Sequence, residues 1–173
     1  ASPLVTTIYS LTETITATGC QQTNPVTVTV NPIPIAPIIV ANGPLAFCVG
    51  NNVILSGNTN GVWSTGATTP TLTVSASGDY FVTNSNACGN AVSNHLIVTV
   101  NLLPLAAVGN NAAICVGSSV TLGSAPIVGH TYLWTPALGL SSATISNPIA
   151  SPTQTTTYSL TETITATGCQ QTN

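Results

Sequence analysis

Residues 1–24 read ASPLVTTIYSLTETITATGCQQTN, and residues 150–173 read ASPTQTTTYSLTETITATGCQQTN. They differ at only three pairs of positions: Leu4 and Thr153, Val5 and Gln154, Ile8 and Thr157. Convergent packing does not give such near-identity, because exposed positions match as well as buried ones. Self-similarity at a fixed spacing is the signature of a repeat protein. Since residue 150 repeats residue 1, the period is 149 residues, and we interpret the chain as one period plus the start of the next.

The composition is poor in charge. Of the 173 residues 43% are hydrophobic, none is Lys or Arg, and the only acids are Glu13, Asp79 and Glu162, which gives a net charge of −3. Binding to nucleic acid or to anionic membranes depends on Lys and Arg, so we exclude both partners. Lysine-based chemistry is excluded as well, and trypsin-like proteases find no cleavage site. No apolar run approaches the roughly 20 residues of a membrane-spanning helix.

Short alternations of apolar and polar residues recur along the whole chain, with Gly, Pro, Asn and Ser between them. Residues 26–30 (VTVTV) alternate strictly, and residues 96–100 (LIVTV) do so nearly. No stretch carries the 3.6-residue period of an amphipathic helix. Short strands separated by frequent turn signals indicate a sandwich or a small barrel, and abundant Thr suits strands. The sequence therefore predicts an all-β fold.

A weaker repeat lies inside the 149-residue period. Residues 47–55 (FCVGNNVIL) match residues 114–122 (ICVGSSVTL), and residues 96–101 (LIVTVN) match residues 26–31 (VTVTVN). Each period therefore holds two related domains, each ending in a closing strand. Proline-bearing segments follow both closing strands and favour semi-rigid linkers.

The two levels of repetition predict the domain boundaries. Residues 1–31 are the end of a domain whose front lies in the preceding repeat. Residues 36–101 are a complete domain. Residues 103–173 are a domain that stops before its last strand, the counterpart of residues 25–30.

The five cysteines take equivalent places in this scheme. The alignment predicts one disulfide between Cys48 and Cys88 and another between Cys115 and Cys169. Cys20 is the counterpart of Cys169, so we expect its partner in the preceding repeat. Disulfide frameworks of small all-β domains form outside the reducing cytosol, and such a bond stabilises by roughly 4 kcal/mol. We therefore expect an extracellular or cell-surface protein.

One acid conflicts with the strand pattern. In the stretch YSLTETI, strict alternation places Glu162 on the same face as Tyr158, Leu160 and Ile164. A buried lone carboxylate is costly, so we expect a β-bulge or a strand end that lets Glu162 reach water. The same expectation holds for its counterpart Glu13.

No group of residues predicts catalysis, a cofactor or a bound metal. The acids are far apart in sequence, and His95 and His130 lie in different predicted domains, where we expect surface positions. Paired carboxylates or a calcium cage need several convergent oxygens, and a Ser or Thr nucleophile needs a neighbouring base. We therefore do not expect an enzyme.

Four aromatic residues are interpreted as core. Trp63 and Trp134 lie between the cysteines of each domain, where immunoglobulin-like sandwiches keep a buried Trp. Tyr80 and Tyr158 open strands, and we expect a structural role for both. The alternative for the two Trp residues is a carbohydrate-stacking platform, which exposure on a flat face would indicate.

The combined motifs resemble a known group of repeats. The pattern F/I-C-V-G-x-x-V-x-L, then W-S/T, S-G-D-Y-F-V, A-C-G-N and V-T-V-N-x-x-P, is similar to the immunoglobulin-like and PKD-like repeats of giant surface proteins in Bacteroidetes-type bacteria. The resemblance covers nearly the whole chain. It implies tandem β-sandwiches in a long secreted adhesin, gliding-associated filament or surface fibre exported by the type IX route. This chain departs from the group in its lack of Lys and Arg and in a longer stretch from Tyr158 to Cys169.

We therefore expect a structural repeat of an extracellular filament or adhesin stalk, with neighbouring repeats as its partners and surface glycans as a further candidate. Val26, Val28 and Val30 mark the strand expected to pair between domains or between chains. Three alternatives stay open: subunits polymerised by donation of this strand, carbohydrate-binding modules, and spacers of a large secreted hydrolase.

Overall fold

The computed structural model describes residues 1–173 and confirms the all-β prediction. Sixteen short strands and no helix are present, and the strands form six small sheets, mostly of antiparallel pairs. The chain divides into two compact units. The first comprises Ala1–Val40, Ser56–Leu72 and Tyr80–His95, and the second comprises Ala41–Leu55, Thr73–Asp79 and Leu96–Asn173.

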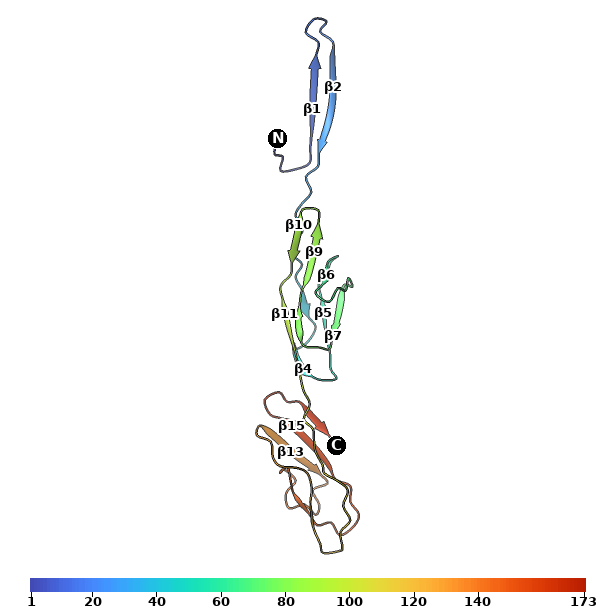
Figure 1. Ribbon diagram of the computed structural model, residues 1–173, viewed down its shortest axis with the longest axis vertical. Helices are drawn as coiled ribbons and strands as arrows, with labels where there is room; N and C mark the ends of the chain where they lie inside the picture. The colour runs from blue at the N-terminus through green and yellow to red at the C-terminus, as the bar shows by residue number, and fades with distance from the viewer. The chain divides into compact units, whose positions relative to one another are not determined.

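The first unit begins with a long hairpin of β1 (Thr7–Thr14) and β2 (Gln21–Val28), which run side by side in Figure 1. The strands pair from Thr7 opposite Val28 to Thr14 opposite Gln21. Gly19 closes the turn with a φ of 71°, and its N–H donates to the carbonyl of Ile15 at 2.7 Å. A residue with a Cβ is strained at such a φ, which explains the glycine.

The duplicated sequence forms the same hairpin a second time. The strands of this second copy are β15 (Ser159–Ile164) and β16 (Gln170–Thr172). The register is identical, because Thr12 faces Thr23 and Thr161 faces Thr172, with the two hydroxyl oxygens 2.8 Å apart in each pair. Local sequence therefore determines the hairpin and its register.

Burial differs sharply between the two copies. Leu160 in β15 is 1% exposed, whereas its counterpart Leu11 in β1 is 73% exposed. Leu160 forms a core with Ala106 and Trp134, and the partly buried Val108, Leu122, Tyr132, Leu140 and Tyr158 pack against that core. No such residues cover β1, so its apolar face is open.

The rest of the first unit centres on a sheet with the strand order β10-β9-β6. Its strands are β6 (Val62–Trp63), β9 (Val82–Asn86) and β10 (Gly89–Val92). Ile39, Trp63, Tyr80 and Val82 are buried in this unit. A further sheet, whose residues fall in both units, is formed by β3 (Val40–Ala41), β5 (Val53–Ser56) and β7 (Thr71–Val74).

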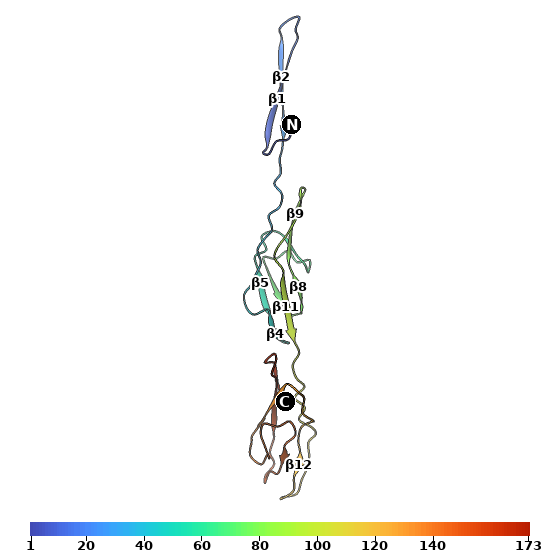
Figure 2. The same cartoon turned by 90° about the vertical axis from the view of Figure 1, so that its left-hand side faces the viewer.

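A three-stranded sheet places the predicted closing strand at its centre. Its order is β4-β11-β8, with β4 (Ala46–Cys48), β8 (Gly78–Tyr80) and β11 (Leu96–Asn101). β11 runs parallel to β4, and the two lie side by side in Figure 2. Thr99 is opposite Ala46 and Asn101 is opposite Cys48, while the side chain of Val98 is buried. The closing strand thus holds β4 in the sheet.

The C-terminal part of the second unit contains two sheets. β12 (Val120–Thr121) pairs with β14 (Ile149–Ala150), and β13 (His130–Thr135) pairs with β15, which also pairs with β16. Trp134 of β13 lies opposite Leu160 of β15, so two of the three residues of the core cluster come from one strand pair.

The two hairpin copies provide a matched test of the core. Leu160→Ala removes buried methyl groups and leaves a cavity, so we expect the free energy of unfolding to fall by about 2–5 kcal/mol. Leu11→Ala makes the same change in the same local sequence at an exposed position, where we expect less than about 0.5 kcal/mol. Urea unfolding followed by Trp fluorescence measures both, and equal losses would show that the hairpin of β1 and β2 is packed.

Candidate functional site

The structure brings together no group of three or more His, Cys, Asp or Glu side chains that could hold a metal ion. None of its elements is a helix long and apolar enough to cross a membrane. The ring of His95 stacks on Phe81, with the centroids 4.7 Å apart. The features described below are a groove beside segments that belong to no strand, the five cysteines, and the hydrogen bonds that side chains make to the linkers.

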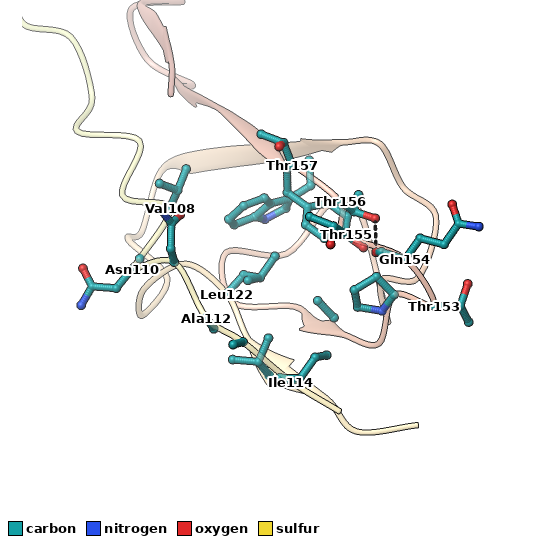
Figure 3. Close-up of a pocket in the computed structure, with 18 of the residues that line it drawn as sticks. Val108, Asn110, Ala112, Ile114, Leu122, Thr153, Gln154, Thr155, Thr156 and Thr157 are labelled. Atoms are coloured by element: carbon teal, nitrogen blue, oxygen red, sulfur yellow. Dashed lines mark hydrogen bonds between the residues drawn. The ribbon is translucent and has the colours of Figure 1, made fainter. Parts of the chain in front are cut away.

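A groove with a volume of about 760 Å³ lies in the C-terminal part of the second unit. One wall is the segment 108–116 and the other is the segment 152–158, with Leu122 and Trp134 among the lining residues (Figure 3). Ala113–Cys115 on the first wall belong to no strand. Neither wall of the groove belongs to a strand.

Sequence alignment relates the two walls of the groove to two strands of the predicted domain 36–101. Ala113–Cys115 are the sequence counterpart of β4, and Tyr158 on the other wall is the counterpart of Tyr80 in β8. β11 lies between β4 and β8. The turn after each cysteine is also the same, because Asn51 N–H donates to Cys48 O at 3.1 Å and Ser118 N–H donates to Cys115 O at 2.9 Å. Unlike β4 and β8, however, neither Ala113–Cys115 nor Tyr158 belongs to a strand.

The residues predicted as a donor strand show how such a strand pairs. Val28 in β2 lies opposite Thr7, and Val26 lies opposite Tyr9. The counterparts of Thr7 and Tyr9 are Thr156 and Tyr158, which line the groove. Val26 and Val28 are 60% and 38% exposed, and Val30 is half-buried. Val98, which matches Val28 in the alignment of residues 96–101 with residues 26–31, is by contrast buried in β11.

The disulfide differs from both predicted pairings and is a correction to them. The structure joins Cys48 to Cys169, with 5.6 Å between the Cα atoms, and leaves Cys20, Cys88 and Cys115 as free, exposed thiols. Internal alignment identified the equivalent cysteines but not their partners. A cysteine can bond only where the Cα atoms come within about 7 Å, which depends on how the strands end.

The local structure explains the change. Cys48 ends β4 beside Asn101, the last residue of the closing strand. Cys88 lies in the turn between β9 and β10, where its Sγ donates to the carbonyl of Asn31 at 3.5 Å. The bond formed thus links the predicted domains 36–101 and 103–173 instead of closing either one.

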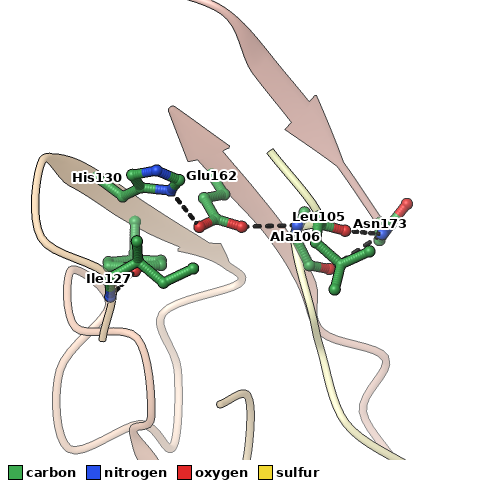
Figure 4. Close-up of polar contacts among 7 residues, drawn as sticks. Leu105, Ala106, Ile127, His130, Glu162 and Asn173 are labelled. Atoms are coloured by element: carbon green, nitrogen blue, oxygen red, sulfur yellow. Dashed lines mark hydrogen bonds and ion pairs between the residues drawn. The ribbon is translucent and has the colours of Figure 1, made fainter. Parts of the chain in front are cut away.

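Glu162 also departs from expectation. The strand β15 continues through it without a bulge, and its side chain is 3% exposed, so the predicted route to water is wrong. Both carboxylate oxygens are satisfied instead, because Oε2 accepts the N–H of Ala106 at 2.6 Å and Oε1 lies 2.6 Å from His130 Nδ1 (Figure 4). Which of these two atoms donates depends on the tautomer of the His130 ring. His130 is therefore partly buried, with its side chain 15% exposed, and does not lie fully on the surface as expected.

Asn side chains fasten the linkers, which the sequence analysis did not foresee. The Nδ2 groups of Asn84 and Asn86 donate to the carbonyls of Ile35 and Pro32 at 3.0 and 2.9 Å. Asn173 Nδ2 donates to the carbonyls of Leu105 and Ala106, at 2.9 and 3.0 Å. Linker carbonyls that have no ladder partner are thus satisfied by amides. The feature of the sequence that could have indicated these contacts is the presence of Asn in β9, and directly after β16.

The predicted aromatic residues lie in the interior. Trp63 and Trp134 are 1% and 2% exposed, and their indole N–H groups donate to the carbonyls of Thr69 and Ile145. Tyr80 is buried, and Tyr158 is half-buried with its hydroxyl donating to Leu138 O at 2.8 Å. Neither Trp offers a face for sugar stacking.

Comparison of the sequence with protein-family models and with curated proteins finds no match in either.

Glu162→Ala leaves the N–H of Ala106 and the ring of His130 without their shared acceptor. Because an unsatisfied buried donor costs about 1–3 kcal/mol, and more beside a charged group, we expect the free energy of unfolding to fall by about 2–4 kcal/mol. The matched control is Glu13→Ala, at an exposed position of identical local sequence, with an expected change below about 0.5 kcal/mol. Chemical denaturation measures both, and a neutral Glu162→Ala would contradict the network.

Cys48→Ser removes the disulfide that closes a loop spanning 121 residues. In the chain-entropy treatment such a loss destabilises by about 4–5 kcal/mol. Cys88→Ser should leave stability within about 0.5 kcal/mol, because Cys88 is a free thiol. Thermal unfolding without reductant compares the variants. Equal destabilisation by both substitutions would instead indicate that Cys48 is bonded to Cys88.

Proposed function

We propose that the chain is a structural repeat module of an extracellular filament, fibre or adhesin stalk, built from tandem immunoglobulin-like or PKD-like β-sandwiches. Each sandwich is completed by a closing strand and leads directly into a short linker to the next domain. The protein acts mechanically, as a covalent string of domains, and carries out no reaction.

The observation that carries this proposal is the match between the open groove and the duplicated sequence. The groove lies where the domain 36–101 has β11, and the stretch Pro25–Asn31, which follows the first copy of the duplicated sequence, has the pattern of β11. In a continuous array the residues after each copy of QQTN are this stretch. The occupant of the groove is therefore a closing strand of sequence PVTVTVN, supplied by the same chain.

The linkers support the same role. Pro fixes φ and lacks an N–H, so segments such as Pro32–Pro37 stay extended. Asn84 and Asn86 attach this linker to the hairpin of β9 and β10, and Asn173 attaches the following linker to its own domain. Side-chain amides thereby fix the start of each domain to its entry segment, which suits a string that transmits force.

Composition supports an extracellular setting. The disulfide between Cys48 and Cys169 favours an oxidising compartment. The absence of Lys and Arg removes all sites for trypsin-like proteases, and Thr, Ser, Asn and Gln supply surface polarity in place of charge.

A second candidate, polymerisation of separate subunits by strand donation, is favoured by the same groove. The exposed Val26 and Val28 of one subunit would enter the groove of another. Residues 1–24 would then compete with residues 150–173 for one place, since the sequences are nearly identical. We therefore rank it second. The denatured, reduced mass of native filaments separates the two: hundreds of kilodaltons indicates one covalent chain, and 17.4 kDa indicates subunits.

A carbohydrate-binding module needs an aromatic platform, and the burial of Trp63 and Trp134 gives it no support.

The groove is tested by extending the chain. We append PVTVTVN after Asn173 and expect the unfolding midpoint in urea to rise, because the extension pairs with both walls and buries three valines. In β11 the residues matching Val26, Val28 and Val30 are inward, whereas those matching Thr27 and Thr29 are exposed. Val28→Asp within the extension should abolish the gain, and Thr27→Asp should preserve most of it. No gain from the unaltered extension would overturn the closing-strand proposal.

A further inference from the structure

The disulfide uses one cysteine of each of two classes. We name Cys48 and Cys115, which lie in the C-V-G motif, the front cysteines, and Cys20, Cys88 and Cys169, which lie near the end of their domains, the back cysteines. The bond formed joins the front cysteine of the domain 36–101 to the back cysteine of the domain 103–173. A front cysteine is therefore bonded to the back cysteine of the domain that follows it.

The end of the closing strand marks this bond. Asn101, the last residue of β11, is opposite Cys48 in the parallel pairing of β11 with β4, and its carbonyl accepts the N–H of Val49 at 2.9 Å. Cys169 reaches Cys48 at this point. The front cysteine Cys48 therefore lies beside both the asparagine that ends the closing strand, Asn101, and the back cysteine Cys169.

The free thiol of Cys88 lies at the equivalent place one domain earlier. Asn31 is the counterpart of Asn101, and the Sγ of Cys88 is 3.5 Å from the carbonyl oxygen of Asn31. In a completed domain the residue opposite Asn31 is the front cysteine of the preceding domain, by the register that pairs Asn101 with Cys48. Cys88 is thus already positioned against the spot where that front cysteine belongs.

We propose that every junction of the array carries such a bond, so that Cys115 pairs with the Cys88 of the next repeat. By the same rule Cys20 pairs with the Cys48 of the preceding repeat. This inference rests on the continuous array proposed above. The spacing agrees, because the next Cys88 lies 149 residues after Cys88 and hence 122 residues after Cys115, against 121 residues between Cys48 and Cys169.

The rule accounts for all three free thiols. Cys20 and Cys88 are back cysteines whose front partners precede residue 1, and Cys115 is a front cysteine whose back partner follows residue 173. Each bond forms when two thiols lose two protons and two electrons to a disulfide-bearing oxidant, by thiol–disulfide exchange, and the oxidant is reduced to two thiols.

The test is a tandem chain in which residues 25–173 follow Asn173, compared with the 173-residue chain. After oxidation by a glutathione redox buffer, free thiols are counted in denaturant. We expect three free thiols in both chains, because lengthening adds two bonds and four cysteines. Five free thiols in the tandem chain would mean that the new junction stays open, and one would mean pairing within domains. Either result overturns the inference.

Two substitutions in the tandem chain identify the partners. Cys115→Ser in the first repeat removes one cysteine yet should raise the count from three to four, because the Cys88 of the second repeat loses its partner. Cys88→Ser in the first repeat removes a thiol that has no partner and should lower the count to two. A count that falls after Cys115→Ser contradicts the pairing.

The proposed function is measured separately in the same chain. If the tandem chain gains the stability expected from the closing strand but shows five free thiols, the array stands and the junction bond does not. If that gain is absent, the array itself fails.

Discussion

The fold depends on a strand that is paired on both sides. The backbone of a segment such as β4 cannot stay in a sheet unless another strand satisfies its N–H and C=O groups. β11 does this for β4 and β8 within residues 36–101. In the C-terminal segment, where no such strand is present, Ala113–Cys115 remain outside any sheet although their sequence matches β4. The closing strand therefore decides both the sheet and the position of the front cysteine.

The sequence was sufficient for features that depend on neighbours in the chain. The all-β class follows from alternation and Thr content, and the duplicated sequence forms the same hairpin with the same register twice, although the sequence analysis did not predict the hairpins. The cysteine partners did not follow, because equivalent spacing is compatible with bonds inside a domain and between domains. Only the way that β4 and the hairpin of β9 and β10 end distinguishes the two schemes.

Comparison of the two copies of the duplicated stretch shows that local sequence does not determine the burial of a residue. Glu13 and Glu162 occupy identical contexts, yet Glu162 is buried because Ala106 and His130, from segments far away in the sequence, supply its hydrogen bonds. Leu11 and Leu160 differ in the same way, because only Leu160 meets Trp134. Whether a hairpin residue is buried thus depends on segments far from it in the sequence. A strand pattern therefore predicts which face is apolar but not whether other residues cover that face. In this chain without Lys or Arg, side-chain amides such as those of Asn84 and Asn173 make the polar contacts that ion pairs make in other proteins. Salt has little effect on such hydrogen bonds between neutral groups.

The disulfide has a consequence for extensibility. The 121 residues from Cys48 to Cys169 would reach roughly 400 Å if pulled straight, at about 3.3 Å per residue. The bond holds the Cα atoms of Cys48 and Cys169 5.6 Å apart. A force that pulls on the two ends of the chain is therefore transmitted through the disulfide and not through the strands of the loop. Unfolding of that loop adds no contour length to the chain while the bond is intact. Reduction of the disulfide would allow these residues to extend, whereas residues 1–47 and 170–173 lie outside the loop and are not held by the bond.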